Sequence, residues 1–276
     1  MPASPSIDIL YGTAWKQDDT ERLVRLAIEA GFRGIDTACQ PKHYNEAGVG
    51  AGIAACLGAR LSRAQLYLQT KFTPPSGHEP RQIPYDARAP LALQVEQSSA
   101  ASLANLRTDY LDCLLLHAPL EDGHQTAEVW HAMESLVHGG RVRQLGISNC
   151  YHLAQLEALC GRARIQPAVL QNRFHAETGY DQALRAYCRE RHIVYQSFWT
   201  LTANPQLLSH ETVRGLARHH GRTAAQILFR YLTQIGIVPL TGTRSAAHMR
   251  QDLAIFDFEL SQPQCEAMAA LLQPAA

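Results

Sequence analysis

Residues 9–36 read ILYGTAWKQDDTERLVRLAIEAGFRGID and contain the pattern that decides the fold. Ile9–Ala14 is a short apolar run typical of a buried strand. In Thr20–Ala30 the apolar residues recur at helical spacing, and Gly31 follows as an end signal. Phe32–Asp36 is again mostly apolar and predicts a second strand. A strand, a helix and a further strand in this order are typical of a parallel sheet.

The same alternation continues along the rest of the chain. The later predicted strands are Leu66–Lys71, Tyr110–His117, Val142–Ser148, Ala168–Gln171, Ile193–Ser197 and Ile237–Leu240. The later predicted helices begin at Asn45 or span Leu91–Leu106, Thr126–Val137, Leu153–Leu159, Asp181–Glu190, Glu211–Arg218, Thr223–Gln234 and Ala246–Leu253. Eight strands that each precede a helix predict an α/β fold, a closed (β/α)8 TIM barrel of eight parallel strands with outer helices. A final helix, Gln262–Leu272, is expected outside the barrel, and residues 1–276 are expected to form one domain.

Length and charge narrow the classes of function. The 276 residues fit the ~250 residues typical of one such barrel. The 25 basic and 25 acidic residues give a formal net charge of zero, which provides no long-range attraction to nucleic acid or to an anionic membrane. A small-molecule partner is therefore favoured.

Nothing in the sequence predicts export, a membrane anchor or a metal site. Residues 1–6 are small and polar, and no apolar run approaches the ~18 residues of a membrane span, so we expect a soluble cytoplasmic protein. The seven cysteines are scattered without a C-x-x-C, and most should be reduced and structural. His124, His131 and His138 recur every seven residues, but each step spans ~10.5 Å along a helix, too far for shared coordination. They are interpreted as a surface stripe.

Polar residues stand at the ends of most predicted strands. In barrels of this kind the active site forms at the carboxyl ends of the strands. These ends carry Asp36, Lys71, His117, Ser148 with Asn149, Gln171 with Asn172, and Thr241–Thr243. Any one of them could be a satisfied buried group or a helix cap, but six together predict a polar site at one mouth of the barrel. The long Pro- and Gly-rich connection 72–89 follows the third strand and is expected on the same face.

Several motifs add a resemblance to this pattern. GFRGIDTA at residues 31–38 is followed by Tyr44-Asn45-Glu46 and Val49-Gly50. Thr70-Lys71, DYLD at residues 109–112 leading to His117, GISN at 146–149 and Gln171-Asn172 come next, in that order. Together they resemble the aldo-keto reductase superfamily over nearly the whole chain, from Gly12 to Leu260.

The resemblance implies reduction of a carbonyl by hydride transfer, with Tyr44, Lys71, Asp36 and His117 as catalytic residues. Such a reaction needs a proton donor ~3 Å from the carbonyl oxygen and stabilisation of the developing alkoxide. Because a nearby cation can lower a pKa by ~1–3 units, Lys71 is expected to lower the pKa of Tyr44. Asp36 would hold the Lys71 ammonium, and His117 would donate toward the substrate oxygen and orient it.

The segment before Tyr44 departs from the family's usual spacing. Cys39–His43 intervenes, so a remodelled loop must place Tyr44. Lys42 and His43 could contribute to the acid role, compete for it, or be solvated loop residues. Tyr11 is a weaker rival as proton donor, because its position in the first strand suits packing.

The cofactor implied by the resemblance is a reduced nicotinamide dinucleotide. No G-x-G-x-x-G follows the first strand, so a Rossmann site is not supported. By resemblance, Ser148, Asn149 and Gln171 bind the carboxamide, and Phe198 stacks on the ring where the family usually has a tyrosine. The expected cofactor-binding residues are Gly12, Thr13, Ala14, Asp36, Ser148, Asn149, Gln171, Phe198, Trp199, Leu201, Thr241, Gly242, Thr243, Arg244, His248, Gln251 and Asp252.

NADPH is favoured over NADH, which stays possible. Residues 241–244 and the helix that opens at Ser245 resemble the family's adenosine-phosphate site, since a helix N-terminus favours anions. Many relatives carry Lys after the strand-eight proline, but Leu240 stands there in this chain. Arg244 and Arg250 are then the cations left for a 2′-phosphate, and His248 takes the approximate place of a familiar arginine.

The substrate pocket is expected to include Trp15, His43, Tyr44, His117 and Trp199, with the 72–89 loop as a further wall. Ala118 stands where relatives often have Trp, and the chain ends at Ala276 without a long C-terminal loop, so an open pocket is expected. Bulky or varied aldehydes and ketones, and cyclic imines, are the expected substrates, and a monomer is implied by the resemblance.

Two other functions stay open. A Schiff-base lyase could use a strand-terminal lysine, here Lys71, and would need no nicotinamide. A non-catalytic subunit on this fold would keep the cofactor without turnover, although the four-residue cluster argues against it.

Overall fold

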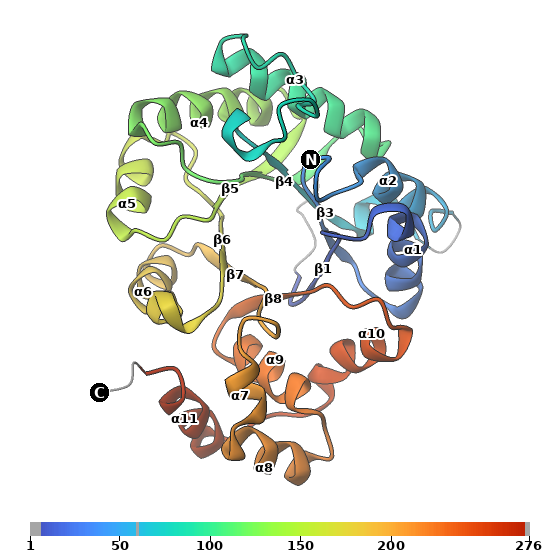
Figure 1. Cartoon of the computed structure of the whole chain (residues 1–276), viewed down its shortest axis with the longest axis vertical. Helices are drawn as coiled ribbons and strands as arrows, with labels where there is room; N and C mark the ends of the chain where they lie inside the picture. Colours follow the sequence, from blue (N-terminus) through green and yellow to red (C-terminus); the bar gives the residue numbers. More distant parts are fainter. Residues whose placement is uncertain (1–6, 59–60, 274–276) are drawn as a thin grey trace.

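The structure, a computed structural model that describes residues 7–58 and 61–273, is built around a closed barrel (Figure 1). Parallel strands pair in chain order, and β8 closes the barrel on β1. The strands are β1 Leu10–Gly12, β2 Gly34–Asp36, β3 Tyr67–Phe72, β4 Leu111–Leu116, β5 Val142–Ser148, β6 Val169–Arg173, β7 Val194–Phe198 and β8 Ile237–Thr241. The (β/α)8 barrel predicted from the alternation is therefore confirmed.

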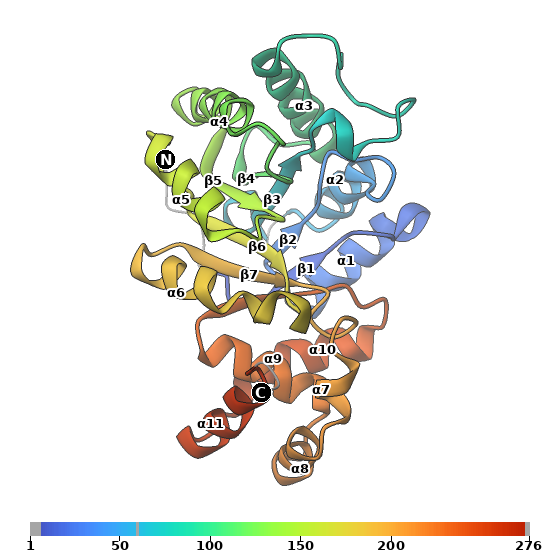
Figure 2. The same cartoon turned by 60° about the vertical axis from the view of Figure 1, so that its left-hand side comes forward.

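The helices lie outside the ring of strands. They are α1 Thr20–Ala30, α2 Glu46–Ala54, α3 Leu91–Leu106, α4 Gly123–His138, α5 Leu153–Arg162, α6 Gln182–Glu190, α7 Pro205–Ser209, α8 Glu211–His220, α9 Ala224–Gln234, α10 Ala246–Leu253 and α11 Gln262–Ala270. Figure 2 shows the molecule from another side, and in both views α7, α8 and α11 gather at one end.

The predicted boundaries are closest where the sequence pattern is strongest. The bounds of α1, α3, α10 and β5 are as predicted. The short helix α7 was not predicted, because five residues are too few for a helical period to show. The last helix ends at Ala270, not at Leu272 as expected.

The first βα unit shows how local sequence produces the fold. The apolar face of α1 is buried through Leu23, Val24, Ala27 and Ile28. Gly31 then adopts a φ of 123°, a conformation that side chains disfavour, and so ends the helix. The next residue, Phe32, packs against Tyr11 of β1 with ring centroids 5.6 Å apart. The helix is thereby fixed against its own strand.

Along β3, the side chains that point into the barrel change from apolar surroundings at the start of the strand to polar surroundings at its carboxyl end. Tyr67, Gln69 and Lys71 face the same side because side chains alternate along a strand. Tyr67 belongs to a small apolar cluster inside the barrel together with Leu10, Cys113, Leu115 and Val169. Gln69 contacts other side-chain amides, and Lys71 reaches the carboxyl end of the strand. The polar site therefore lies directly on this packed floor.

Residues 1–6, on which the expectation of no targeting segment rests, lie outside the described residues. Within residues 7–58 and 61–273, no helix is long and apolar enough to cross a membrane. The seven cysteines are free.

Candidate functional site

A cavity of about 940 Å³ opens at the carboxyl ends of the strands. Its lining contains the residues selected from the sequence for catalysis, cofactor or substrate, with the exception of Thr13 and Arg250, and no residue of the 72–89 loop, which was expected as a further wall, is part of it. Other lining residues were not predicted from the sequence, namely Lys16, Gln40, Thr200, Thr202, Thr223, Ala225, Phe229 and Leu240. The strand ends thus converge on one cavity, as barrel geometry requires.

Asp36 and Lys71 form a buried ion pair at the base of this cavity. Lys71 Nζ donates to Asp36 Oδ1 and Oδ2 at 2.7 and 2.8 Å and to the Thr37 carbonyl at 2.8 Å. These three acceptors match the three N–H groups of an ammonium. Because both side chains are buried, each charge depends on the other for compensation.

Three glutamine side chains surround Asp36 on the barrel side. Gln69 Nε2 and Gln171 Nε2 donate to Asp36 Oδ1 at 2.7 and 2.9 Å. The same two nitrogens donate to Gln196 Oε1 at 2.8 and 2.9 Å. Both N–H groups of Gln171 therefore point inward, and Oε1 is the atom that its amide can offer to a ligand. Gln69 and Gln196 were missed because they lie within strands, not at strand ends.

The extended loop before Tyr44 is held by its own side chains. Gln40 Nε2 donates to the Gly77 carbonyl at 2.7 Å, which leaves Gln40 Oε1 to accept from His43 Nδ1 at 2.8 Å. The backbone N–H groups of His43 and Tyr44 both donate to the Gln40 carbonyl, at 3.1 and 3.0 Å. This tight turn absorbs the extra residues and places Tyr44 beside the catalytic strand ends.

Tyr44 lies between His117 and Lys71. Its ring makes an edge contact with the His117 ring at a centroid distance of 6.2 Å, and Lys71 Nζ lies 5.6 Å from its centroid. Among the described residues the Tyr44 hydroxyl has no hydrogen-bond partner, although Tyr44 lines the cavity. The hydroxyl is therefore available to a ligand.

The expectation that Lys71 lowers the pKa of Tyr44 is wrong for this structure. Burial raises the pKa of Tyr44, and the nearby Asp36 carboxylate raises it further. The physical reason is that Asp36 already compensates the Lys71 charge at hydrogen-bond distance. Tyr44 is consequently held as the protonated phenol, which is the form that can donate a proton.

Lys42 and His43 occupy different surroundings. Lys42 forms an exposed ion pair with Glu79 and does not line the cavity. His43 lines the cavity and stacks on Trp15 with ring centroids 3.9 Å apart. Burial, together with the charge of Lys42, lowers the pKa of His43. Of the two loop residues, only His43 can contact a ligand in the cavity.

The surroundings of His117 favour a neutral imidazole. Burial lowers its pKa well below the ordinary value, and the Lys71 charge lowers it further. Asn149 Nδ2 donates to the His117 carbonyl at 2.8 Å, and His117 Nδ1 lies 2.6 Å from Thr73 Oγ1. Within the described part of the chain, Nε2 has no protein partner and is left for the cavity.

Ser148 and Asn149 use most of their hydrogen-bonding groups within the protein. The Ser148 hydroxyl donates to the Gln171 carbonyl at 2.7 Å. Asn149 Oδ1 accepts from Tyr151 at 3.2 Å, while its Nδ2 is directed to His117. Asn149 also has a φ of 52°, a left-handed conformation that asparagine tolerates. Gln171 is therefore the best-placed of the three amide and hydroxyl candidates for a ligand.

Thr13 does not face the cavity, which corrects its selection as a cofactor-binding residue. It is fully buried, and both its backbone N–H and its hydroxyl donate to the Asp36 carbonyl, at 3.0 and 2.9 Å. The side chain after β1 is turned toward β2 because it satisfies the end of that strand. Its role is to fix the backbone of Asp36.

Lys16 is a cation in the cavity that sequence reasoning missed. Its Nζ donates to the Gly242 carbonyl at 2.8 Å, in the segment selected as an anion site. Burial and the charge of Arg244 lower the pKa of Lys16 to about 8. The position of Lys16 in the loop directly after β1 was the available signal.

Tyr11, the weaker rival as proton donor, is a packing residue. Its hydroxyl already donates to the Thr243 carbonyl at 2.9 Å.

Arg244, which follows β8, contacts the segment that follows β1 in this part of the cavity. Its guanidinium pairs with Asp19 at 2.9 Å and donates to the Trp15 carbonyl at 2.6 Å. Arg250, the other cation considered for a 2′-phosphate, is exposed and does not line the cavity. Asp252 does line it, and burial raises the pKa of Asp252 to about 6 even though Thr241 donates to it.

Two tryptophans form the rim of the cavity. Trp15 is 54% exposed and Trp199 is 48% exposed, so both present apolar surface to an incoming ligand. Both have left-handed backbones, with φ of 61° and 53°. Trp199 is covered by the Arg173 guanidinium at 4.4 Å, and Trp15 by His43. These stacks hold two conformations that bulky residues otherwise avoid.

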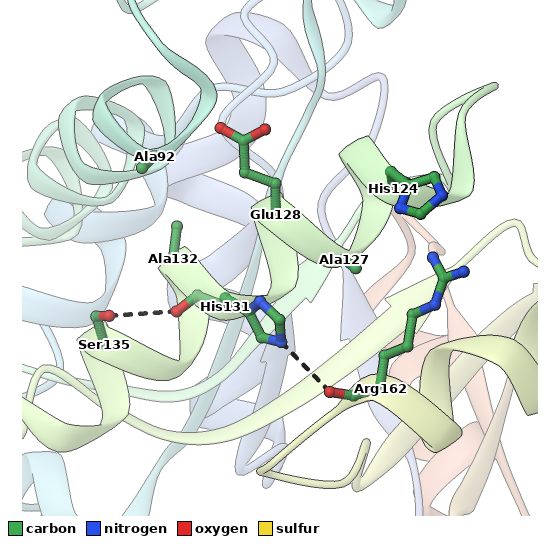
Figure 3. Close-up of a pocket in the computed structure, with 8 residues that line it drawn as sticks. All are labelled: Ala92, His124, Ala127, Glu128, His131, Ala132, Ser135 and Arg162. Atoms are coloured by element: carbon green, nitrogen blue, oxygen red, sulfur yellow. Dashed lines mark hydrogen bonds between the residues drawn. The ribbon is translucent and has the colours of Figure 1, made fainter.

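A second depression, of about 740 Å³, lies on the outer surface between α3, α4 and α5 (Figure 3). His131 Nε2 contacts the Arg162 carbonyl at 3.3 Å, while Glu128 points away from both (Figure 3). His124 and His131 lie along α4, as the surface-stripe interpretation expects. The side chains do not converge, and across the described ranges no group of three or more His, Cys, Asp or Glu could hold a metal ion. The catalytic candidates all belong to the barrel mouth.

The fold and the site define a class of protein: a (β/α)8 barrel with a buried Asp–Lys pair beside a tyrosine and a neutral histidine at its carboxyl mouth. The sequence model of the Aldo/keto reductase family matches residues 8–273. The chain belongs to this family, and therefore to the oxidoreductases, which confirms the resemblance found in the motifs.

Named relatives cover most of the chain. A glyoxal reductase of Bacillus subtilis (strain 168) is 32% identical over 90% of this chain and 82% of its own length. Methylglyoxal reductase DkgA of Yersinia pestis is 30% identical over 92% of this chain and 84% of its own. The crystal structure of the Bombyx mori aldo-keto reductase AKR2E4 in complex with NADP is similar with a TM-score of 0.82, at 25% identity, covering 98% of this chain and 93% of that one.

Proposed function

We propose that this protein reduces aldehydes and ketones to alcohols with a hydride from NADPH, and that Tyr44 donates the proton. One observation carries the proposal: the Tyr44 hydroxyl and His117 Nε2, both without protein partners in residues 7–58 and 61–273, share one cavity beside the buried Asp36–Lys71 pair. A carbonyl oxygen between these two groups would meet one proton donor and one hydrogen-bond donor.

The residues of the cavity suit a nicotinamide dinucleotide. Gln171 Oε1 is an acceptor held in place from behind, as a carboxamide N–H group needs. Phe198 lines the same cavity and offers a ring for stacking. Lys16 and the N-terminus of α10, which Ser245 caps, supply positive charge for phosphates. When bound, the reduced nicotinamide would supply the hydride.

The protein's own groups then handle the proton. Hydride addition turns the carbonyl oxygen into an alkoxide, which is a stronger base than a phenolate. Tyr44 can therefore donate although burial raises its pKa. His117 donates from Nε2 to the same oxygen and orients it, while Lys71 compensates the Asp36 charge close to Tyr44.

The preference for NADPH over NADH is supported by charge and by one relative. Besides Lys71, which pairs with Asp36, Lys16 and Arg244 are lysine and arginine side chains that line the cavity. The similar Bombyx mori protein was crystallised with NADP. NADH stays a candidate for two reasons. Asp19 partly neutralises the charge of Arg244, and the cavity also contains the carboxyl group of Asp252.

Small reactive carbonyls are the first substrates to test. Two of the relatives are a glyoxal reductase and a methylglyoxal reductase. The two exposed tryptophans at the rim add a surface for flat or bulky aldehydes.

The Schiff-base lyase alternative is disfavoured by the contacts of Lys71. A lysine nucleophile needs a free amine, whereas Lys71 Nζ donates to three acceptors and pairs with a carboxylate.

The decisive experiment is to mix the protein with NADPH or NADH and a panel of glyoxal, methylglyoxal and aromatic aldehydes. Oxidation of the reduced cofactor, followed by absorbance, supports the proposal, and absence of cofactor binding overturns it.

A further inference from the structure

Thr73 touches His117 from behind the cavity. It is the first residue after β3, is 2% exposed and does not line the cavity. Its Oγ1 lies 2.6 Å from His117 Nδ1. The backbone N–H of His117 donates to the carbonyl of the neighbouring Phe72 at 2.9 Å, so the two strand ends are also joined through their main chains. The Thr73 side chain therefore meets a histidine whose backbone is already fixed.

The direction of this hydrogen bond follows from the surroundings of Thr73. Among the described residues, the Thr73 hydroxyl has no other acceptor within hydrogen-bond distance than Nδ1. If Nδ1 carried the proton, the buried hydroxyl hydrogen would be left without an acceptor, an arrangement that costs ~1–3 kcal/mol. The hydroxyl accordingly donates to Nδ1, and the proton of the neutral imidazole is on Nε2.

The long 72–89 loop holds Thr73 in place. Two side chains of this loop donate to the Thr73 carbonyl, Tyr85 at 2.7 Å and His78 Nε2 at 3.0 Å. The Tyr85 ring packs against Phe72 and against His78, each at a centroid distance of 5.6 Å. The loop is thus a brace for one threonine, although its sequence shows no periodic pattern.

We propose that Thr73 is a positioning residue that fixes the Nε2–H tautomer and the ring orientation of His117, with the 72–89 loop as its support. The proposal rests on the proposed function, in which His117 donates to the carbonyl oxygen. With the other tautomer, a bare Nε2 would direct its lone pair at that oxygen. A neutral imidazole needs such a device, because only a protonated ring donates from both nitrogens.

The charges around His117 agree with a neutral ring. Burial has the largest effect in lowering its pKa, and Lys71 and the cationic forms of His78 and His43 lower it further. No carboxylate is among the groups that shift its pKa. The hydroxyl of Thr73 therefore provides what a carboxylate often provides for a histidine, a defined partner for Nδ1, without making the ring cationic.

The first test is the tautomer itself. Long-range proton–nitrogen NMR correlations of the whole protein distinguish a protonated from a bare ring nitrogen, and the His117→Gln variant identifies the signals. We expect the proton on Nε2 in the wild type. A proton on Nδ1 overturns the proposal. This result is independent of whether the protein reduces aldehydes, so failure of the proposed function is seen separately in the cofactor assay.

The second test removes the hydroxyl. Thr73→Val keeps the shape, and we expect mixed tautomers or a mobile ring in the spectrum and an about five- to tenfold loss of kcat, as for one lost hydrogen bond. Thr73→Ser should restore both readouts, and cofactor affinity should stay unchanged in both variants. Tyr85→Phe should act in the same direction with a smaller loss. Ser99→Ala, which removes a buried hydroxyl without a partner on α3, is the matched control and should change nothing.

Two results with the Thr73 variants would contradict the proposal. An unchanged His117 spectrum and unchanged kcat in Thr73→Val would show that the hydroxyl is structural only. If Thr73→Val does not fold, Thr73→Ser, Tyr85→Phe and the wild-type spectrum still decide the matter, because each reports on the same Nδ1 partner. A loss in Thr73→Val that Thr73→Ser does not restore also counts against the proposal.

Discussion

Lys71 Nζ lies 2.7 and 2.8 Å from the two carboxylate oxygens of Asp36, inside a barrel that excludes both side chains from solvent. Two glutamine side chains add donors to the same carboxylate. The pair is therefore satisfied before any ligand arrives. It forms a fixed frame, and Tyr44 and His117 offer the groups that are still free.

Removal of one partner of the buried ion pair should strongly lower the stability of the fold. Lys71→Met leaves the Asp36 carboxylate buried without its cation, and we expect a loss of about 3–5 kcal/mol in the free energy of unfolding. Asp36→Asn in the same chain should recover part of that loss, because the unpaired charge is gone. Urea unfolding of the single and double variants measures this coupling, and strictly additive losses would contradict it.

Tyr44 should control the chemical step and not the binding of cofactor. Removal of a general acid typically costs ~10²–10⁴-fold in rate, so we expect that loss in kcat for Tyr44→Phe. The dissociation constant for NADPH should change little. Tyr11→Phe is the matched control, since the Tyr11 hydroxyl is committed to the Thr243 carbonyl, and it should stay active. Full activity in Tyr44→Phe would remove Tyr44 from the proton-donor role.

Lys16 should make cofactor affinity depend on pH. Its pKa is lowered to about 8 by burial and by Arg244, and a bound phosphate would raise it again. The free protein therefore loses a proton above about pH 8 that the complex keeps, and affinity should fall by up to ~tenfold per pH unit there. Titration of tryptophan fluorescence with NADPH measures the effect.

The controls for Lys16 are two lysine variants. Lys16→Met should weaken binding below about pH 8 and flatten the dependence above it. Lys42→Met removes a lysine that pairs with Glu79 outside the cavity and should leave the profile unchanged. A flat wild-type profile between about pH 7 and about pH 9 would argue against a role for Lys16.

Asp252 should lower stability at neutral pH. Its pKa is raised from 3.8 to about 6 by burial, so between these values the folded protein holds a proton that the unfolded chain releases. Stability therefore falls as pH rises through this window, and the full cost is present above about pH 6. Asp252→Asn, which still accepts from Thr241, should gain about 1–3 kcal/mol near pH 8. The gain should shrink toward about pH 4 in urea unfolding, and a gain independent of pH would contradict the assignment.

The barrel could be predicted from the sequence because its signal is repeated. Each strand and helix is weak evidence alone, but the alternation recurs along the chain, and the ends of β2, β3 and β4 carry Asp36, Lys71 and His117. Strand ends meet at one face in a parallel barrel, so their convergence needed no knowledge of side-chain packing. Short elements gave no such signal, and α7 was missed for this reason.

The contacts that the sequence could not predict depend on which way each side chain points and on how deeply it is buried. Thr13 and Lys16 are three residues apart, yet one is turned into the strand layer and the other into the cavity. Arg244 pairs with Asp19, 225 positions away, and no local pattern marks that contact. The pKa of Tyr44 depends on how fully Asp36 compensates Lys71, which is a matter of distances.

Hydride transfer in this cavity is tested most directly with NADPH that carries deuterium at both hydrogens of the hydride-donating carbon. Wild-type protein and an aromatic aldehyde should yield an alcohol with one deuterium on the former carbonyl carbon, seen by mass spectrometry and NMR. Tyr44→Phe, with cofactor bound, should yield almost none in the same time. An alcohol without deuterium, or no alcohol while the cofactor is bound, would contradict hydride transfer to a carbonyl in this cavity.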